Sequence, residues 1–241
     1  MMAKLTIGWM YPNLLNLHGE RGSVQALEKC AKEMGVDVRI QRIEDFDDPI
    51  PFSELDLMIF LPGELTQMQY LLPAMKNQMD SLVKYIQDGH YVIALGTTGL
   101  LFGKTTRRED GGIFDGLGLL DLTATERKYV WGDDLHFRLE DGTKIIGSQI
   151  TMADIDSKCP LGITLYGRGN NGSGTEGSRY LNLIHTNCQG PVFVKNPWWA
   201  EEIIRETLAA KGEHPEGSVD HTIARNSYKA TLAFINEKPK A

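Results

Sequence analysis

Cysteine is scarce in this 241-residue chain, which contains only Cys30, Cys159 and Cys188. The number is odd and the three residues lie far apart, so the sequence indicates neither a disulfide framework nor a zinc site. A reducing compartment, the cytoplasm, is the expected location. No metal or other cofactor is expected.

Long apolar runs and an excess of basic residues are also missing. No stretch approaches the roughly 20 apolar residues of a membrane span, and the start of the chain lacks the charged and apolar regions of a signal peptide. A net charge of -7 argues against nucleic acid or an anionic membrane as the main partner. The proportions of hydrophobic residues (41%) and charged residues (24%) are those of a soluble globular protein.

The first hundred residues alternate between strand and helix patterns. Buried strands separated by helices are typical of a parallel sheet that is covered on both faces. The sequence therefore predicts an α/β fold with a doubly wound, mostly parallel sheet, in layers like those of flavodoxin. The predicted strands are 5–10, 36–40, 57–61 and 91–95, and the predicted helices are 23–34 and 67–88.

The sequence pattern changes after Phe102, where glycine-rich turns separate short runs of alternating apolar and polar residues. Runs 135–139 and 144–147 predict antiparallel strands appended to the main sheet. A last core strand is expected over 181–185. Pro197 should open a final helix over 198–211, which Trp198 and Trp199 would anchor to the sheet. Residues 220–241 read as a charged helical tail that packs loosely or reaches towards a partner, and the whole chain, 1–241, reads as a single domain.

The most informative segment is the apolar run from Tyr91 to Gly103, which turns sharply at small residues into a helix pattern. In an α/β fold, a nucleophile at such a turn sits at the carboxyl end of the strand beside the N–H groups of the helix start. Here the tip reads Gly96-Thr97-Thr98-Gly99, without cysteine or serine. The turn has the form of a nucleophile site but no strong nucleophile.

Four further segments stand out by their order and spacing: Tyr11–Gly22, Gly116–Asp121, Gly167–Asn171 and Gly190–Pro197. Together they resemble the class I glutamine amidotransferases of the cobyric acid synthase type. Within that family the chain is most similar to the glutaminase subunits of lipid II isoglutaminyl synthases, which act beside a Mur-ligase-like subunit in peptidoglycan synthesis. The resemblance covers nearly the whole chain and implies the fold predicted above.

The resemblance fails at the catalytic positions. The family uses a cysteine thiolate to attack the glutamine amide and a histidine to move protons. A family pattern resembling Ile-Cys-Gly-Gly-Tyr-Gln falls on Leu95–Leu100, which places Gly96 at the cysteine. A pattern resembling Thr-Tyr-Leu-His-Gly-Pro falls on Thr186–Pro191, which places Gln189 at the histidine. Glycine cannot be acylated, and a glutamine side chain cannot act as a base near neutral pH.

The segments around these positions differ from the family as well. A Gly-Gly pair expected at the oxyanion site reads Pro62-Gly63, and proline lacks an N–H donor. A Glu-Asn-His run expected before the Gly-Arg pair falls within 148–154, Ser-Gln-Ile-Thr-Met-Ala-Asp. The candidate substrate-binding residues that remain are Pro62, Gly63, Thr97 and Thr98.

Other side chains could be imagined as replacements. Strand alternation would turn Cys188 away from the side to which Gln189 points, so we expect a buried, inert thiol. His185, at the end of a strand, is expected to be structural, and Thr97 and Thr98 to cap the following helix. The turn lacks the spacing of a dinucleotide site and the lysine of a phosphate loop.

Two hypotheses of different classes follow. In the first, the chain is a non-catalytic subunit that docks on a Mur-ligase-like partner and holds it active, or binds glutamine without hydrolysing it. In the second, it is a working glutaminase that uses rearranged residues such as Cys188 and His185 to supply ammonia for amidation of lipid II or of a corrinoid-like carboxylate. A third reading, an unrelated ligand in the emptied pocket, stays open.

Overall fold

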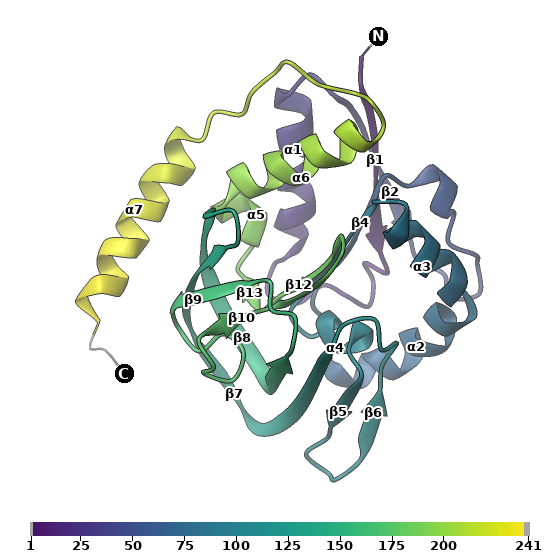
Figure 1. Cartoon of the computed structure of the whole chain (residues 1–241), viewed down its shortest axis with the longest axis vertical. Helices are drawn as coiled ribbons and strands as arrows, with labels where there is room; N and C mark the ends of the chain where they lie inside the picture. The colour runs from purple at the N-terminus through teal and green to yellow at the C-terminus, as the bar shows by residue number, and fades with distance from the viewer. Residues whose placement is uncertain (1, 239–241) are drawn as a thin grey trace.

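The computed structural model describes residues 2–238 and is built around a six-stranded sheet (Figure 1). Its order is β11-β12-β4-β3-β1-β2, and every neighbouring pair is parallel except β11 and β12. The crossovers leave β1 in both directions, as in a doubly wound fold. The strands are β1 (Lys4–Met10), β2 (Asp37–Ile43), β3 (Leu57–Phe60), β4 (Tyr91–Leu95), β11 (Ser178–Tyr180) and β12 (Leu183–Thr186).

Helices cover both faces of this sheet (Figure 1). α1 (Arg21–Glu33) and α6 (Pro197–Ala210) pack together on one face, while α2 (Met68–Asn77) and α3 (Met79–Gln87) cover the other. β3 and β4 are buried along their whole length, which explains their uninterrupted apolar sequences. Short helices complete the layer: η1 (Phe52–Glu54), η2 (Leu65–Gln67), α4 (Thr98–Phe102) and α5 (Val192–Lys195).

A second, largely antiparallel sheet packs beside the first. The predicted runs 135–139 and 144–147 are the facing ends of two much longer strands, β7 and β8. The predicted antiparallel extension is thus a separate sheet. The chain passes from one sheet to the other between β12, which lies in the first sheet, and β13, which lies in the second. Its strands are β5 (Thr105–Arg107), β6 (Ile113–Asp115), β7 (Leu122–Leu139), β8 (Lys144–Ser157), β9 (Gly162–Tyr166), β10 (Thr175–Glu176) and β13 (Cys188–Gln189).

Two predicted elements need correction. The single helix over 67–88 is interrupted at Gln78, whose backbone leaves the helical region and whose side chain accepts a hydrogen bond from the Ile50 N–H at 2.6 Å. A side-chain contact to another segment therefore breaks a pattern that reads as continuous. The last core strand begins later than predicted, because Leu181 lies in the left-handed region (φ +51°) and turns the chain into β12.

The tail forms α7 (Thr222–Glu237), so the predicted helix is confirmed, although the last residues of the predicted range 220–241 lie outside the described residues. Only Ile235 of α7 is fully buried. Tyr228 reaches His136, with 2.9 Å between the hydroxyl and Nε2, and Arg225 stacks on Trp198.

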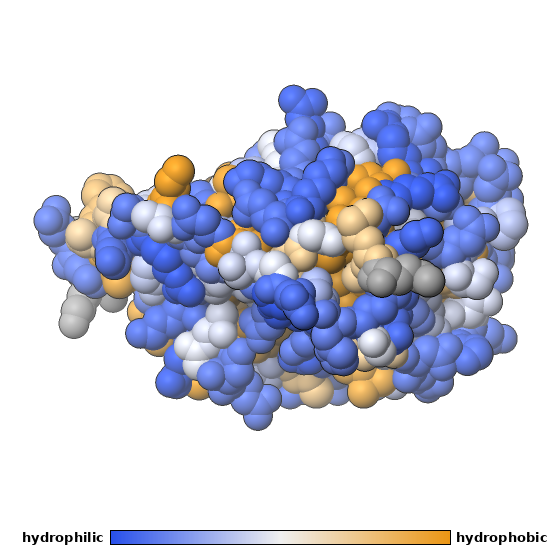
Figure 2. All heavy atoms as spheres, turned by 90° about the horizontal axis from the view of Figure 1, so that it is seen from above, coloured by the Kyte–Doolittle hydropathy of each residue, from blue (hydrophilic) through white to orange (hydrophobic). Residues whose placement is uncertain are grey.

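Trp198 and Trp199 are both buried at the start of α6, as predicted. Seen from above, hydrophilic residues cover most of the molecule and break the apolar surface into small areas (Figure 2). Across residues 2–238, the structure contains no helix with the length and hydropathy that crossing a bilayer requires.

Candidate functional site

The sharp turn predicted after the fourth strand is present. β4 ends at Leu95, and Gly96 follows in the left-handed region (φ +59°), with its N–H bonded to the Thr186 carbonyl at 2.9 Å. α4 begins two residues later. A side chain at position 96 would thus project from a strained strand-to-helix turn, which is the geometry of a nucleophile elbow.

The structure brings Gly96 and Gln189 together. A β-carbon built on Gly96 would lie 2.7 Å from Gln189 Nε2 and 3.3 Å from the β-carbon of Pro62. The two positions that the sequence assigns to the nucleophile and the general base therefore face each other directly. The Gln189 carboxamide fills the space that a side chain on residue 96 would need.

Gln189 is almost fully buried, with 1% of its surface exposed. Its Nε2 donates a hydrogen bond to the Ile150 carbonyl at 3.2 Å, which holds the side chain against the second sheet. Within residues 2–238 its Oε1 has no hydrogen-bond partner. The carboxamide is a fixed neutral group and offers no titratable nitrogen.

Thr97 and Thr98 do not cap α4, so that prediction was wrong. The Thr97 hydroxyl donates to the Gly63 carbonyl and accepts from the Gly63 N–H at 3.1 Å. The Thr98 hydroxyl donates to the Leu95 carbonyl at 2.9 Å. Both side chains tie the turn to the neighbouring backbone, and Thr97 also occupies the N–H that Gly63 could otherwise offer to an oxyanion.

Pro62 and Gly63 line the same space but cannot form a two-donor oxyanion hole. Pro62 has no N–H, and its carbonyl accepts the Leu17 N–H at 3.0 Å. The Gly63 N–H is bonded to Thr97, as described above. Preorganised donors supply much of the transition-state stabilisation in acyl transfer, and this segment provides none that is free.

Cys188 lies outside this space. It is completely buried, its sulfur faces Gly147 on β8, and burial raises the pKa of its thiol well above the ordinary value. The prediction that Cys188 and Gln189 point to opposite sides is confirmed. A buried, protonated thiol directed into the protein core is neither reachable nor nucleophilic.

His185 is structural in its contacts. The ring is fully buried against Gly99, and its Nε2 donates to the Gly96 carbonyl at 3.1 Å. Burial lowers the pKa of His185 to about 4, so the ring is neutral near pH 7. This hydrogen bond supports the turn, and His185 does not line the cavity beside Gly96.

A cavity of about 380 Å³ opens beside the turn. Most of its wall is apolar, and Val130 and Met152 at its border are exposed. His18 also borders it, and burial lowers the pKa of that ring below its usual value. Its sixteen lining residues include all the candidate substrate-binding positions except Thr98; they are Leu17, His18, Pro62, Gly63, Glu64, Leu65, Thr66, Thr97, Leu100, Glu126, Val130, Ile150, Thr151, Met152, Ala153 and Gln189.

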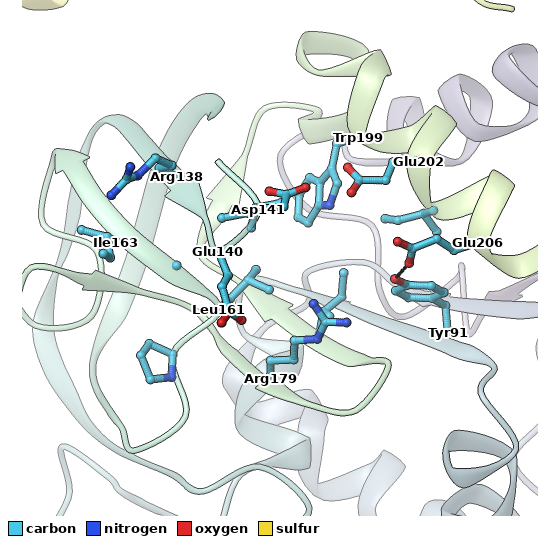
Figure 3. A pocket seen from close by; sticks show the side chains of 15 residues that line it. Tyr91, Arg138, Glu140, Asp141, Leu161, Ile163, Arg179, Trp199, Glu202 and Glu206 are labelled. Carbon is cyan, nitrogen blue, oxygen red and sulfur yellow. Dashed lines mark hydrogen bonds between the residues drawn. The ribbon is translucent and has the colours of Figure 1, made fainter. Parts of the chain in front are cut away.

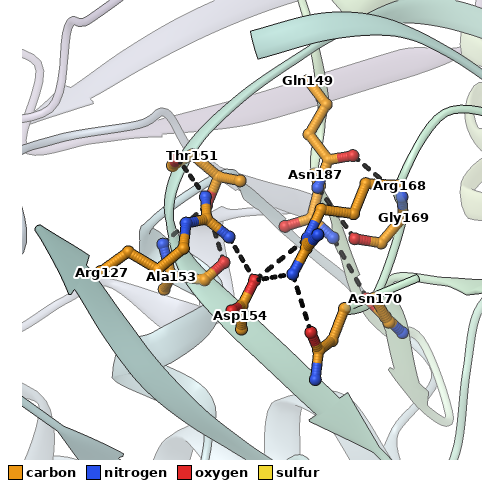
Figure 4. Close-up of polar contacts among 10 residues, drawn as sticks. Arg127, Gln149, Thr151, Ala153, Asp154, Arg168, Gly169, Asn170 and Asn187 are labelled. Carbon is orange, nitrogen blue, oxygen red and sulfur yellow. Dashed lines mark hydrogen bonds and ion pairs between the residues drawn. The ribbon is translucent and has the colours of Figure 1, made fainter. Parts of the chain in front are cut away.

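Sequence reasoning missed the ionic network behind this cavity (Figure 4). Asp154 accepts hydrogen bonds from Arg168 at 2.8 Å and from Arg127. The other terminal nitrogen of Arg127 donates to the carbonyl of Thr151, a residue of the cavity wall, at 2.6 Å. This network fixes the irregular part of β7 and β8. Only the Gly-Arg pair at 167–168 gave a signal for it in the sequence.

Glu20 is a second residue that the sequence did not single out. Its buried carboxylate accepts the Gly190 N–H, the Ser23 hydroxyl at 2.8 Å and the Val192 N–H at 3.4 Å. Burial raises the pKa of Glu20, while these hydrogen bonds act in the opposite direction. The segments Tyr11–Gly22 and Gly190–Pro197, far apart in sequence, are therefore joined directly behind Gln189.

The fold is similar to that of a solved glutamine amidotransferase structure. A crystal structure of a glutamine amidotransferase superposes with a TM-score of 0.54, covering 83% of this chain and 98% of that one at 13% sequence identity. This chain has a glutamine amidotransferase-like fold. No family model matches the sequence.

Curated relatives are similar over most of the chain. Each is a GatD subunit of lipid II isoglutaminyl synthase (glutamine-hydrolyzing). The one from Streptococcus pneumoniae (strain ATCC BAA-255 / R6) is 25% identical over 217 residues, which are 86% of this chain and 82% of the relative. The one from Staphylococcus aureus (strain N315) is 26% identical over 216 residues, 88% of this chain and 87% of the relative.

Proposed function

We propose that this chain is a glutamine amidotransferase-like subunit of the cobyric acid synthase type that serves in the amidation of lipid II and has lost glutaminase activity. The observation that carries the proposal is that Gln189 faces Gly96 across a nucleophile-type turn, with its Nε2 2.7 Å from where a β-carbon on residue 96 would lie. Similarity to the GatD subunits supports the pathway, and the substituted pair supports the loss of chemistry.

The chemistry of the pair supports the proposed loss of activity, because residue 96 itself cannot form an acyl-enzyme. Hydrolysis of a glutamine side-chain amide through an acyl-enzyme needs a nucleophile and a base in contact. Position 96 has no side chain, and position 189 has no titratable group. The nearest hydroxyl of the turn, on Thr97, is held by both backbone groups of Gly63.

The alternative of an active glutaminase built on Cys188 and His185 has little geometric support. The Cys188 thiol faces Gly147 on β8 and remains protonated, while the His185 ring lies beneath Gly99. Neither residue lines the cavity beside the turn. Ammonia release abolished by Cys188→Ala would nevertheless establish this alternative.

The proposed partner is a Mur-ligase-like subunit in the cytoplasm, which would carry out the ligation with free ammonia while this chain holds it in an active conformation. The relatives' names support the role of a subunit in a larger synthase. We also propose that the chain forms one domain, because β12 and β13 join the two sheets directly at the candidate site.

The test is ammonia release from glutamine by this chain co-purified with its ligase partner, beside a GatD subunit with its own partner as the positive control. A stable complex without ammonia release, but with ligase activity supported by added ammonium, is the expected result. Glutamine-dependent ammonia release from the wild-type complex would overturn the proposal. Binding of glutamine alone, measured by calorimetry, separates a glutamine-sensing subunit from a purely structural one.

A further inference from the structure

A second cavity, of about 640 Å³, is separate from the one beside the Gly96 turn, and Figure 3 shows the side chains that line it. Tyr91, the first residue of β4, borders it, whereas Gly96 follows the last residue of that strand. The two cavities share no lining residue. This one is an open cavity lined by residues of α6, the β7–β8 hairpin, β9 and β11, and the proposed function does not involve it.

The base of this cavity is apolar and aromatic. Trp199 and Ile203 of α6 contribute to it together with Leu161, Ile184 and Tyr91, and all five residues are buried. Apolar and aromatic surfaces of this kind bind the apolar part of a small molecule. The polar groups stand around it on two sides.

One side is acidic. The carboxyl groups of Asp141, in the hairpin, and Glu202, on α6, both line this side (Figure 3), and each lies close enough to the other to affect its pKa. Burial, followed by the neighbouring Asp141, raises the pKa of Glu202 to about 7. The Glu202 carboxyl group is therefore partly protonated near neutral pH. Beside them, Glu206 accepts a hydrogen bond from the Tyr91 hydroxyl.

The other side is basic. Arg179 lies close enough to Glu202 to affect the pKa of that residue, yet no carboxylate in residues 2–238 forms an ion pair with it. Its Nε donates to the Leu181 carbonyl at 2.7 Å, which orients the guanidinium and leaves the terminal nitrogens available. A guanidinium and a pair of carboxyl groups therefore face one space without neutralising each other.

This arrangement fits a ligand that carries both charges. In residues 2–238, no group of three or more histidine, cysteine, aspartate or glutamate residues is placed to hold a metal ion. We propose that the cavity binds a free α-amino acid, with its ammonium group at the Asp141–Glu202 pair, its carboxylate at Arg179 and an apolar side chain over Trp199 and Leu161. The site is independent of the proposed function and of the Gly96 turn.

Binding should release a proton to the solvent. An ammonium group is stabilised more strongly by two ionised carboxylates than by one ionised and one protonated carboxyl group, so binding lowers the pKa of Glu202 and its proton leaves. The groups that set this equilibrium come from every surrounding element. They are Arg138, Glu140 and Asp141 of the hairpin, Glu206 of α6, Tyr91 of β4, Arg179 of β11, and Lys144 and Arg225, which border the adjoining cavity next to Glu202.

The experiment is isothermal titration calorimetry of the full chain with L-leucine, L-phenylalanine and L-lysine. Isopentylamine and 4-methylpentanoate serve as probes that carry only one of the two charges. We expect at least one amino acid to bind about tenfold or more tightly than either single-charge probe, and to bind more tightly at about pH 8 than at about pH 6. Titration in buffers of different ionisation enthalpy should show proton release at about pH 6.

Variants locate the site. Glu202→Gln and Arg179→Gln should each weaken binding about tenfold, whereas Arg179→Lys should retain part of the affinity. Glu28→Gln, on the outer surface of α1, is the matched control and should bind as the wild type does. Thermal unfolding of each variant shows that it is folded. Equal binding of isopentylamine and leucine, absence of binding by all three amino acids, or unchanged affinity in Glu202→Gln would each overturn the proposal.

Discussion

Introducing a β-carbon at Gly96 tests the geometry of the candidate site most directly. Gly96→Ala adds one methyl group at a left-handed residue (φ +59°), and that methyl group would lie 2.7 Å from Gln189 Nε2. Two costs follow, one from the backbone and one from the contact. Because Gln189 is itself buried and bonded to Ile150, it cannot simply swing into solvent.

The magnitude follows from these two costs. A non-glycine residue in the left-handed region costs about 1 kcal/mol, and overpacking a buried site costs about 2 kcal/mol more. Gly96→Ala should therefore lower the free energy of unfolding by about 3 kcal/mol, which corresponds to a fall of about 9 °C in Tm for a chain of this size. Gly35→Ala is the matched control: Gly35 has φ +77°, no atom lies within 4 Å of its added β-carbon, and only the backbone cost remains.

The assay is a double-mutant cycle read by urea unfolding. In a Gln189→Ala background the contact is gone, so Gly96→Ala should then cost only about 1 kcal/mol, the same as the Gly35 control. The coupling between positions 96 and 189 should be about 2 kcal/mol. Additive effects, with a coupling below about 0.5 kcal/mol, would show that residue 96 does not project at Gln189 and would refute the site geometry.

Three further predictions concern the surroundings of the turn. Burial lowers the pKa of His185 to about 4, below its unfolded value of about 6.5, so unfolding takes up a proton at pH values between these two. The contribution of His185 to the free energy of unfolding should therefore be complete above about pH 6.5, and that free energy should fall by about 3 kcal/mol as the pH drops to 4. Urea unfolding across this range checks it, and a pH dependence unchanged in His185→Asn would contradict it. Ellman's reagent should react only with the exposed Cys159 in the native protein, because Cys30 and Cys188 are buried, and with all three cysteines after unfolding. Rapid reaction of Cys188 in the native protein would show that its thiol is accessible. Asn196→Ala should cost about 3 kcal/mol, because the buried amide bonds both the N–H and the carbonyl of Ile146, and a loss below about 1 kcal/mol would mean that water replaces it.

The sequence determined the order of strands and helices in the first half of the chain. The apolar runs of β3 and β4 and the helical periodicity of α1 are local signals, because each reflects which side of one element is buried. The glycine-rich turn after β4 carries the same kind of local information: a left-handed backbone requires Gly96 or a strained residue. The sequence itself also shows that this turn contains neither cysteine nor serine.

Contacts between distant segments could not be read in this way. The break at Gln78 depends on Ile50, and the hydroxyl of Thr97 turns to Gly63 and not to its own helix. The long β7–β8 ribbon was seen only in part, because its irregular centre is held by the pairing of Asp154 with Arg127 and Arg168 and not by alternation. Each of these features depends on a partner that local periodicity does not encode.

By itself, then, the sequence determined the class of fold and the strand-to-helix turn, and it singled out Gly96 and Gln189 as the positions to compare. Only the tertiary structure decided that Gly96 and Gln189 face each other, that Cys188 points into the core, and that carboxyl groups and an arginine surround a second cavity. The physical reason is that local structure follows from the burial pattern of neighbouring residues, whereas a site is formed by side chains from several strands and helices, whose proximity depends on how the two sheets pack.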